Sequence, residues 1–257
     1  MKDLFDLKGR VAVVTGGNGG IGLGIARGLA SAGASLAIAA RNETKTAEAV
    51  QGLQSEFGVK VIGVKVDVRE EKQIKDMVQK VRDTFGRIDI LFNNAGTNIR
   101  KLPQEYTVAE WDEVLDINLR SAFICSQAVY PAMKAAGGGK IVNTGSMTSI
   151  FSAPKLTLYS SSKGGMVQLT RSLANAWAKD NIQVNAILPG FINTDLTRQA
   201  RKDMPELEER VNLRTPAGRW GEPDDLAGTA VFLASRASDF VTGVALPVDG
   251  GFSVAML

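Results

Sequence analysis

The sequence predicts an α/β fold, a single doubly wound parallel sheet of about seven strands with helices on both faces. Short β-branched runs alternate with longer segments whose apolar residues recur every three or four positions. A glycine-rich turn directly follows the first of these runs. Parallel strands need crossovers, crossovers are right-handed, and the helices therefore cover both faces of the sheet. The expected architecture is a Rossmann-type sheet with its ligands at the carboxyl ends of the strands.

Seven runs are predicted to form the strands, at residues 10–14, 35–40, 61–66, 88–92, 140–144, 182–188 and 243–248. Two helical faces stand out between them, formed by Ile74, Met77, Val78, Val81 and Phe85 and by Met166, Leu169, Leu173 and Trp177. No repeat, low-complexity tract or linker divides the chain. Residues 1–257 are therefore expected to form one dinucleotide-binding domain.

The segment at residues 190–223 is predicted to be the one long irregular region. It is charged and is interrupted by Pro205 and Pro216. Long irregular segments in compact domains often cover active sites, so we expect a mobile lid over the substrate. It presents Phe191, Leu196, Met204 and Leu207, which an apolar ketone could use.

Composition excludes several kinds of chemistry. The chain has no histidine and one cysteine, Cys125, so Ser-His-Asp hydrolysis, histidine-ligated metals and internal disulfides are excluded, and we expect no metal. The 30 basic and 27 acidic residues are interleaved, which is typical of a solvated surface and predicts no nucleic-acid partner. No apolar stretch is long enough for a signal peptide or a membrane span, so we expect a cytoplasmic protein without a membrane partner.

The glycine-rich turn at residues 15–22 is predicted to bind the phosphates of a dinucleotide. Glycines let the backbone approach a pyrophosphate, and the helix that follows offers unpaired N–H groups and a positive dipole. Two spacings fit: Gly16, Gly20 and Gly22 match G-x-x-x-G-x-G, whereas Gly17, Gly19 and Gly22 match G-x-G-x-x-G. The register is thus ambiguous. The expected cofactor contacts in the turn are Gly16, Asn18, Gly20, Ile21 and Gly22.

The residue that ends the second strand predicts the cofactor. Arg41 stands there and suits a 2′-phosphate, so NADP(H) is favoured. Glu43 lies two positions later and leaves NAD(H) possible. Asp67 and Val68 after the third strand are expected near the adenine, and Asn94, Ala95 and Gly96 after the fourth form a backbone against which a cofactor can lie.

Tyr159 and Lys163 carry the strongest chemical signal, because residues four apart share one face of a helix. A tyrosine has a pKa of about 10, and a neighbouring ammonium and an oxidised nicotinamide both lower it toward neutrality. Ser146 follows a strand thirteen residues earlier and can hydrogen-bond the substrate oxygen.

In order along the chain, residues 15–22, 93–96, Asn118, Ser146, Tyr159, Lys163, 189–190 and 249–251 resemble the classical short-chain dehydrogenase/reductase family. The resemblance covers essentially the whole chain. It implies that Tyr159 is the acid/base, that Lys163 lowers its pKa and binds the nicotinamide ribose, and that Ser146 positions the substrate. It implies that Asn118 holds a proton-relay water and that hydride moves between substrate carbon and nicotinamide C4. The positions that would line the cofactor are Asn94, Pro189, Gly190, Ile192 and Thr194.

One departure concerns the cofactor. NADP-using members of that family often carry a basic residue just before the middle glycine of the turn, whereas Gly19 stands here. Arg41 alone therefore carries the NADP(H) inference.

The substrate is predicted from the loop at residues 97–101. The sequence looks most like the sugar-acid branch of the family, such as gluconate and deoxygluconate dehydrogenases, and Arg100 and Lys101 could meet a carboxylate or face solvent. The tentative substrate residues are Ser146, Tyr159, Asn98 and Arg100. Alternatives are a 3-oxoacyl carrier-protein reductase, a reductase of small apolar ketones held by the lid, and a non-catalytic dinucleotide sensor. The presence of both Tyr159 and Lys163 argues against the sensor. By analogy with the family, a homotetramer is expected, with residues 252–257 buried between subunits.

Overall fold

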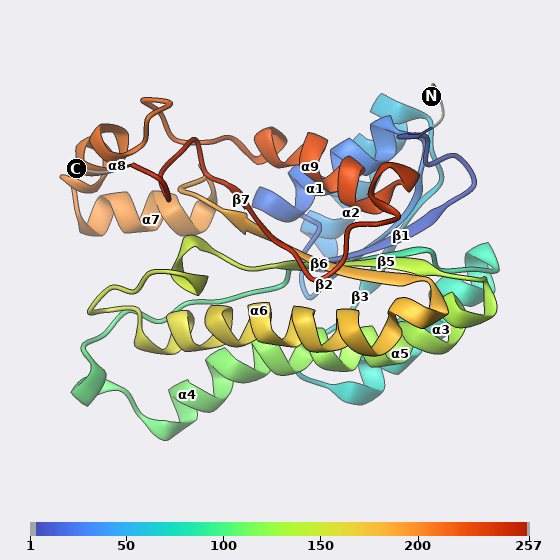
Figure 1. Cartoon of the computed structure of the whole chain (residues 1–257), viewed down its shortest axis with the longest axis horizontal. Helices are drawn as coiled ribbons and strands as arrows, with labels where there is room; N and C mark the ends of the chain where they lie inside the picture. The colour runs from blue at the N-terminus through green and yellow to red at the C-terminus, as the bar shows by residue number, and fades with distance from the viewer. Residues whose placement is uncertain (1–3, 256–257) are drawn as a thin grey trace.

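A computed structural model describes residues 4–255 and confirms the predicted fold. All seven strands pair in parallel in one sheet, in the order β3-β2-β1-β4-β5-β6-β7 (Figure 1). The strands are β1 Val11–Thr15, β2 Ser35–Ala40, β3 Val61–Lys65, β4 Ile90–Asn93, β5 Gly139–Thr144, β6 Ile182–Pro189 and β7 Ala245–Val248. The order reverses between β1 and β4, and a crevice for a ligand forms there at the carboxyl ends.

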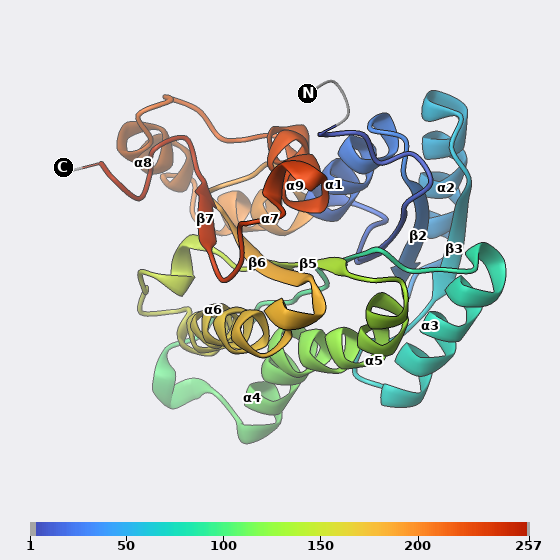
Figure 2. The same ribbon diagram turned by 45° about the vertical axis from the view of Figure 1, so that its right-hand side comes forward.

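Helices cover both faces of this sheet, as Figure 2 shows. One face carries α3 Glu71–Phe85, α4 Val108–Leu115, α5 Ser121–Ala135 and α6 Thr157–Trp177. The other carries α1 Gly20–Ser31, α2 Glu43–Phe57 and α9 Ala227–Ala234, with α7 Asp195–Asp203 and α8 Leu207–Arg214 beside them. Successive strand residues point to opposite faces, so Val11 and Val13 of β1 pack toward α3 while Ala12 and Val14 pack toward α1. No helix in residues 4–255 is both long and apolar enough to cross a bilayer.

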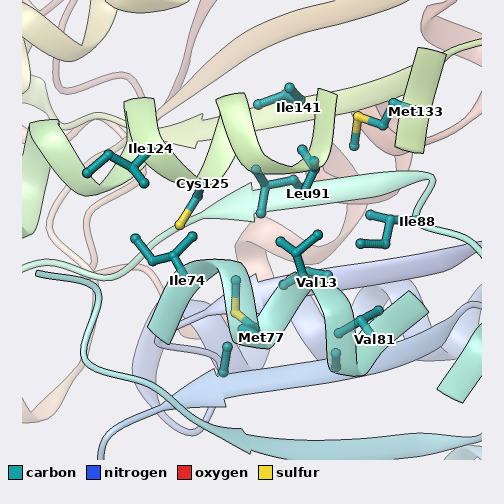
Figure 3. Close-up of a cluster of buried hydrophobic side chains, with 14 of the residues drawn as sticks. Val13, Ile74, Met77, Val81, Ile88, Leu91, Ile124, Cys125, Met133 and Ile141 are labelled. Carbon is teal, nitrogen blue, oxygen red and sulfur yellow. The ribbon is translucent and has the colours of Figure 1, made fainter. Parts of the chain in front are cut away.

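The core between the sheet and α3 and α5 is built from the helical face predicted around Ile74 and Val81 (Figure 3). Those side chains meet Ile124, Cys125 and Met133 of α5 across strand residues such as Leu91. Cys125 is fully buried, and this burial raises the pKa of its thiol to about 12. Cys125 therefore serves packing and is chemically inert.

The segment at residues 190–223 is not irregular, and the prediction was wrong on this point. It contains α7 and α8, and the side chain of Thr194 caps α7 by accepting from the Thr197 N–H. The prolines fall where helices are absent: Pro205 lies between α7 and α8, and Pro216 follows α8. The two ends of the segment pair, since Gly221 N donates to Phe191 O at 2.9 Å and Asn193 N donates to Gly221 O at 2.8 Å.

Candidate active site

The glycine turn between β1 and α1 has a single register. Gly16 and Gly20 adopt left-handed φ angles of 65° and 50°, and a Cβ on Gly22 would lie 2.2 Å from the carbonyl oxygen of Gly16. Gly17 and Gly19 do not have left-handed φ angles. A Cβ on Gly17 would lie 3.0 Å from a backbone oxygen of β1, a tighter contact than usual but far from the overlap at Gly22, and the Cβ of residue 19 would meet only the flexible end of a lysine. The spacing Gly16, Gly20 and Gly22 is therefore the one that the backbone needs.

The amino end of α1 is open to an anion. Its N-cap, Gly19, has no side chain to accept from the first N–H groups. Unpaired N–H groups at a helix start form an anion site when a phosphate reaches them. Asn18 does not point at that site, because its Nδ2 donates to Thr46 Oγ1 at 3.0 Å and to Asn42 O at 3.4 Å. Asn18 thus ties the turn to the start of α2.

The loop after β4 is fastened to the same turn. Thr15 Oγ1 accepts from Asn94 N at 3.0 Å and from Ala95 N at 3.1 Å, while Asn94 Nδ2 donates to Thr15 O and Gly16 O at 3.1 and 3.2 Å. Thr15 was not singled out from the sequence, although its place at the end of β1 is the signal that could have found it. These bonds hold residues 94–96 as one wall of the crevice.

The end of β2 offers one free cation and no free acid nearby. Arg41 is exposed and forms no hydrogen bond or ion pair with any described residue. Glu43 instead pairs with Lys65 Nζ at 2.8 Å. Asp67 pairs with Arg69 at 2.6 Å, and the Arg69 guanidinium, helped by the more distant Arg41, holds the pKa of that carboxyl below its usual value. Val68 beside it is buried.

Asn118 lies in a π-helical turn, Asp116–Arg120, that joins α4 directly to α5. It is fully buried, and its Nδ2 donates to Thr97 O and to Ser162 Oγ, both at 3.0 Å, while its Oδ1 accepts from Thr97 N at 2.8 Å. Asn118 therefore joins the loop after β4 to α6. Such π-turns are frequent at functional sites, and nothing in the apolar pattern predicted this one. Ser162 was also missed, although it precedes Lys163.

Tyr159 and Lys163 lie on one face of α6, with the Lys163 Nζ 5.6 Å from the centre of the Tyr159 ring. Lys163 is only 3% exposed, and its Nζ donates to Thr144 O at 2.7 Å. Burial lowers the pKa of Lys163 to about 8. Burial also raises the pKa of Tyr159, and the Ser146 hydroxyl and the charge of Arg100 oppose that rise. Ser146 and Arg100 are thus each close enough to Tyr159 to act on its hydroxyl.

A cleft brings together about half of the residues that the sequence analysis placed at the site, ten of 21. The predicted residues that line it are Ile21, Asn94, Gly96, Ser146, Tyr159, Lys163, Pro189, Gly190, Ile192 and Thr194. Thr97, which begins the predicted substrate loop, also lines it, and the lining residues that were missed are Thr144, Gly145 and Thr197. The missing side chain of Gly96 leaves a space between two polar groups of the site. A Cβ on Gly96 would lie 3.4 Å from Asn118 Oδ1 and 3.8 Å from Lys163 Nζ.

The remaining predicted residues do not line this cleft. They are Gly16, Asn18, Gly20, Gly22, Arg41, Asp67, Val68, Ala95, Asn98, Arg100 and Asn118. Asn118 contacts Thr97 and Ser162, and the others belong to the glycine turn, the ends of β2 and β3, and the loop after β4.

The two cations of the loop after β4 differ. Lys101 Nζ is held by Glu110 of α4 at 2.5 Å. Arg100 forms no ion pair or hydrogen bond with a described residue, and its charge acts on Tyr159. Asn98 Oδ1 is buried and has no hydrogen-bond partner in residues 4–255. Of the two cations, Arg100 is therefore the one available to an anionic ligand.

One of the apolar side chains of residues 190–223, that of Phe191, is already packed against other rings. Phe191 packs against the rings of Trp220 and Phe252, with centroids 5.3 Å apart in each case. Of the other apolar lid residues, Met204 and Leu207 are partly exposed, and the side chain of Leu196 lies outside the described part of the structure. Within residues 4–255, no group of three or more His, Cys, Asp or Glu side chains is arranged to hold a metal ion.

Known proteins of one family resemble the chain over nearly its whole length. A short-chain dehydrogenase family model, described as "Enoyl-(Acyl carrier protein) reductase", matches residues 16–253. The 2-dehydro-3-deoxy-D-gluconate 5-dehydrogenase of Escherichia coli is 44% identical over 96% of this chain and 97% of its own, and that of Formosa agariphila is 41% identical over 97% and 94%. The crystal structure of a gluconate 5-dehydrogenase from Burkholderia cenocepacia in complex with NADP and tartrate is 41% identical and covers 99% of each chain with a TM-score of 0.94. The chain belongs to the short-chain dehydrogenase/reductase family.

Proposed function

We propose that this protein is an NADP(H)-dependent oxidoreductase that interconverts a secondary alcohol and a ketone on a sugar acid. The observation that carries the substrate class is that Arg100, which has no ion-pair or hydrogen-bond partner in residues 4–255, acts on Tyr159, whereas the neighbouring Lys101 is already held by Glu110. A cation placed this way suits the carboxylate of a sugar acid. The relatives named as gluconate and deoxygluconate 5-dehydrogenases support the same class.

The residues fit an NADP(H) cofactor. The backbone at Gly16, Gly20 and Gly22 permits close approach of a pyrophosphate to the uncapped start of α1. Arg41 has no partner among the described residues, and Glu43, the acid that could have favoured a ribose hydroxyl, is paired with Lys65. NADP is bound in the Burkholderia relative, which supports the choice over NAD(H). Asp67 and Val68 would border the adenine.

Tyr159 is proposed as the acid/base that protonates or deprotonates the substrate oxygen. When bound, the cofactor supplies the hydride and, in its oxidised form, a positive charge. Burial raises the pKa of Tyr159, so Tyr159 needs added positive charge nearby before it acts as a base near neutrality. Lys163 is held by Thr144 and is proposed to supply part of that charge and to bind the nicotinamide ribose.

Ser146 and Asn118 are proposed to orient the reaction. The Ser146 hydroxyl acts on Tyr159, so one substrate oxygen can accept hydrogen bonds from both. Asn118 Oδ1 and Lys163 Nζ both border the space left by Gly96, which suits a proton-relay water. Asn98 and Arg100 would contact the substrate, and residues 190–223 would close over it as a lid.

A rate assay with matched variants tests the substrate class. NADPH oxidation is followed with keto sugar acids, a 3-oxoacyl thioester and uncharged ketones. Arg100→Met is expected to raise KM for keto sugar acids by about tenfold to a hundredfold, since it removes a charged hydrogen bond, and to leave uncharged ketones unaffected. Lys101→Met removes the same charge and serves as the control. A preference for thioesters or apolar ketones, or equal effects of the two variants, would overturn the sugar-acid proposal.

A homotetramer is proposed as the assembled form. Val108 and Trp111 of α4 and Phe123 of α5 are exposed apolar residues on the helical layer, which supports burial against another copy. Residues 252–255 belong to the described end of the chain, whereas Met256 and Leu257 lie outside it. Light scattering at micromolar concentration tests this state, and a monomer would contradict it. Cell fractionation tests the expected cytoplasmic location.

A further inference from the structure

A second cation, Lys45, lies over the glycine turn. Lys45 is in the first turn of α2, and its Nζ comes within 2.8 Å of the point that a Cβ on Gly19 would occupy. The hydrogen bond from Asn18 to Thr46 fixes this part of α2 against the turn. Gly19 has no side chain, and the space that a side chain there would take is filled by Lys45 of α2.

Lys45 and Arg41 stand on two sides of the start of α2. Arg41 precedes the N-cap Asn42, and its charge acts on Asp67 at the end of β3. Lys45 faces the turn that would hold the pyrophosphate. In a dinucleotide, the adenosine ribose lies between the pyrophosphate and the adenine. Its 2′ position would therefore lie between these two cations.

We propose that Lys45 is a cofactor-selecting residue that binds the adenosine 2′-phosphate together with Arg41, and that Asp195 holds Lys45 until the phosphate displaces it. This inference rests on the proposed use of NADP(H). It adds a residue from α2 to the recognition of the phosphate, and it links that recognition to the first residue of α7 in the lid.

The present partner of Lys45 is easily exchanged. Lys45 Nζ and Asp195 Oδ2 are 3.0 Å apart, and their side chains are 44% and 69% exposed. Exposed pairs of this kind stabilise a protein by only about 0 to 1 kcal/mol, and a phosphate dianion attracts an ammonium more strongly than one carboxylate does. Asp195 would not be left alone, because Arg198 also donates to it.

Binding of NADPH and NADH to purified protein tests the proposal, with dissociation constants measured by cofactor fluorescence. Lys45→Met is expected to weaken NADPH binding by about tenfold and to leave NADH binding within about twofold of wild type, since a hydrogen bond to a charged group is lost only for NADPH. Lys45→Arg should restore most of the loss.

Lys72→Met is the matched control, because it removes one exposed lysine of α3 that pairs with Asp76. Asp195→Asn should tighten NADPH binding about twofold to fivefold, since it removes a competitor of that strength.

The outcomes separate this inference from the function on which it rests. Wild-type protein that binds NADPH no better than NADH would overturn the proposed cofactor. Clear NADPH preference that depends on Arg41 but survives Lys45→Met would overturn Lys45 alone. Equal weakening of both cofactors would also overturn it, because the lysine would then act on the pyrophosphate. If Asp195→Asn does not tighten NADPH binding, the proposal that the phosphate displaces Asp195 from Lys45 is overturned.

Discussion

The Nζ of Lys163 donates a 2.7 Å hydrogen bond to the carbonyl of Thr144, the last residue of β5. This bond fixes the reactive face of α6 against the carboxyl end of the sheet. The ammonium is buried, and no carboxylate in residues 4–255 pairs with it. Lys163 therefore carries a charge that destabilises the folded protein, which is the usual condition of a group kept for function.

The pH dependence of stability should report this buried charge. Burial lowers the pKa of Lys163 from 10.5 to about 8, so its destabilising effect is complete below pH 8, fades as pH rises toward 10.5 and is absent above. The difference in unfolding free energy between wild type and Lys163→Met should move in favour of wild type by about 3 kcal/mol across that window. Urea unfolding at several pH values measures it. A difference that stays constant from pH 7 to 11 would contradict the assigned pKa.

Tyr159→Phe should lower turnover by orders of magnitude with little effect on the fold. It removes one hydroxyl from a residue whose ring stays packed, and general acid/base groups contribute about 10²–10⁴ to a rate. We expect a loss of kcat of that size with the NADPH dissociation constant near wild type. Tyr130→Phe removes a hydroxyl bonded to Asp180 at the far end of α5 and is the control. Comparable rates for the two variants would remove Tyr159 from the mechanism.

Gly22→Ala should damage the phosphate-binding turn itself. The added Cβ would lie 2.2 Å from Gly16 O and 2.5 Å from Asn94 Nδ2, so the backbone must shift. We expect a loss of about 1–3 kcal/mol in stability together with weaker binding of both cofactors. Gly52→Ala in α2 meets nothing within 4 Å and should stabilise the helix by about 0.5–1 kcal/mol. Thermal unfolding compares the pair, and similar shifts would mean that the turn is more adaptable than its geometry indicates.

Gly96→Ala should separate activity from folding. Its methyl group would make only ordinary contacts with Asn118 Oδ1 and Lys163 Nζ, at 3.4 and 3.8 Å, but it would fill the space between them. We expect an unchanged melting temperature and a kcat/KM lower by about tenfold to a hundredfold, because small displacements at a reacting centre are expensive. Gly228→Ala on α9 is the control. Full activity in Gly96→Ala would show that no bound group needs that space.

Strand positions were predictable because β-branched runs and strand ends coincide within two residues, as at β2 and β6. The register of the glycine turn was not predictable, because the sequence fits both glycine spacings. Only the φ angles and the close approach of Gly22 to Gly16 distinguish the two. The helices of residues 190–223 were missed because their faces are charged and short, and α7 depends on its Thr194 cap.

Ion pairs and contacts between charged residues far apart in the chain could not be predicted from the sequence either. Arg100 and Lys101 are adjacent and chemically alike, yet only Lys101 meets Glu110 in space. Lys45 likewise has no motif of its own, because its relation to Gly19 arises from the packing of α2 against the turn. The buried roles of Ser162 and Asn118 depend on a π-turn, which leaves no periodic signature.

The parallel bridge between Ile192 and Gly221 closes residues 192–221 into a loop whose two ends lie side by side. Because the two ends of this loop lie side by side, insertions or exchanges within it need not shift β6 or β7. The part of this loop beyond Thr197 can therefore change in evolution while Ile192 and Thr194 stay in the wall of the cleft and Asp195 stays beside Lys45. The same boundary marks where a segment from a relative could be transplanted to change the preferred ketone.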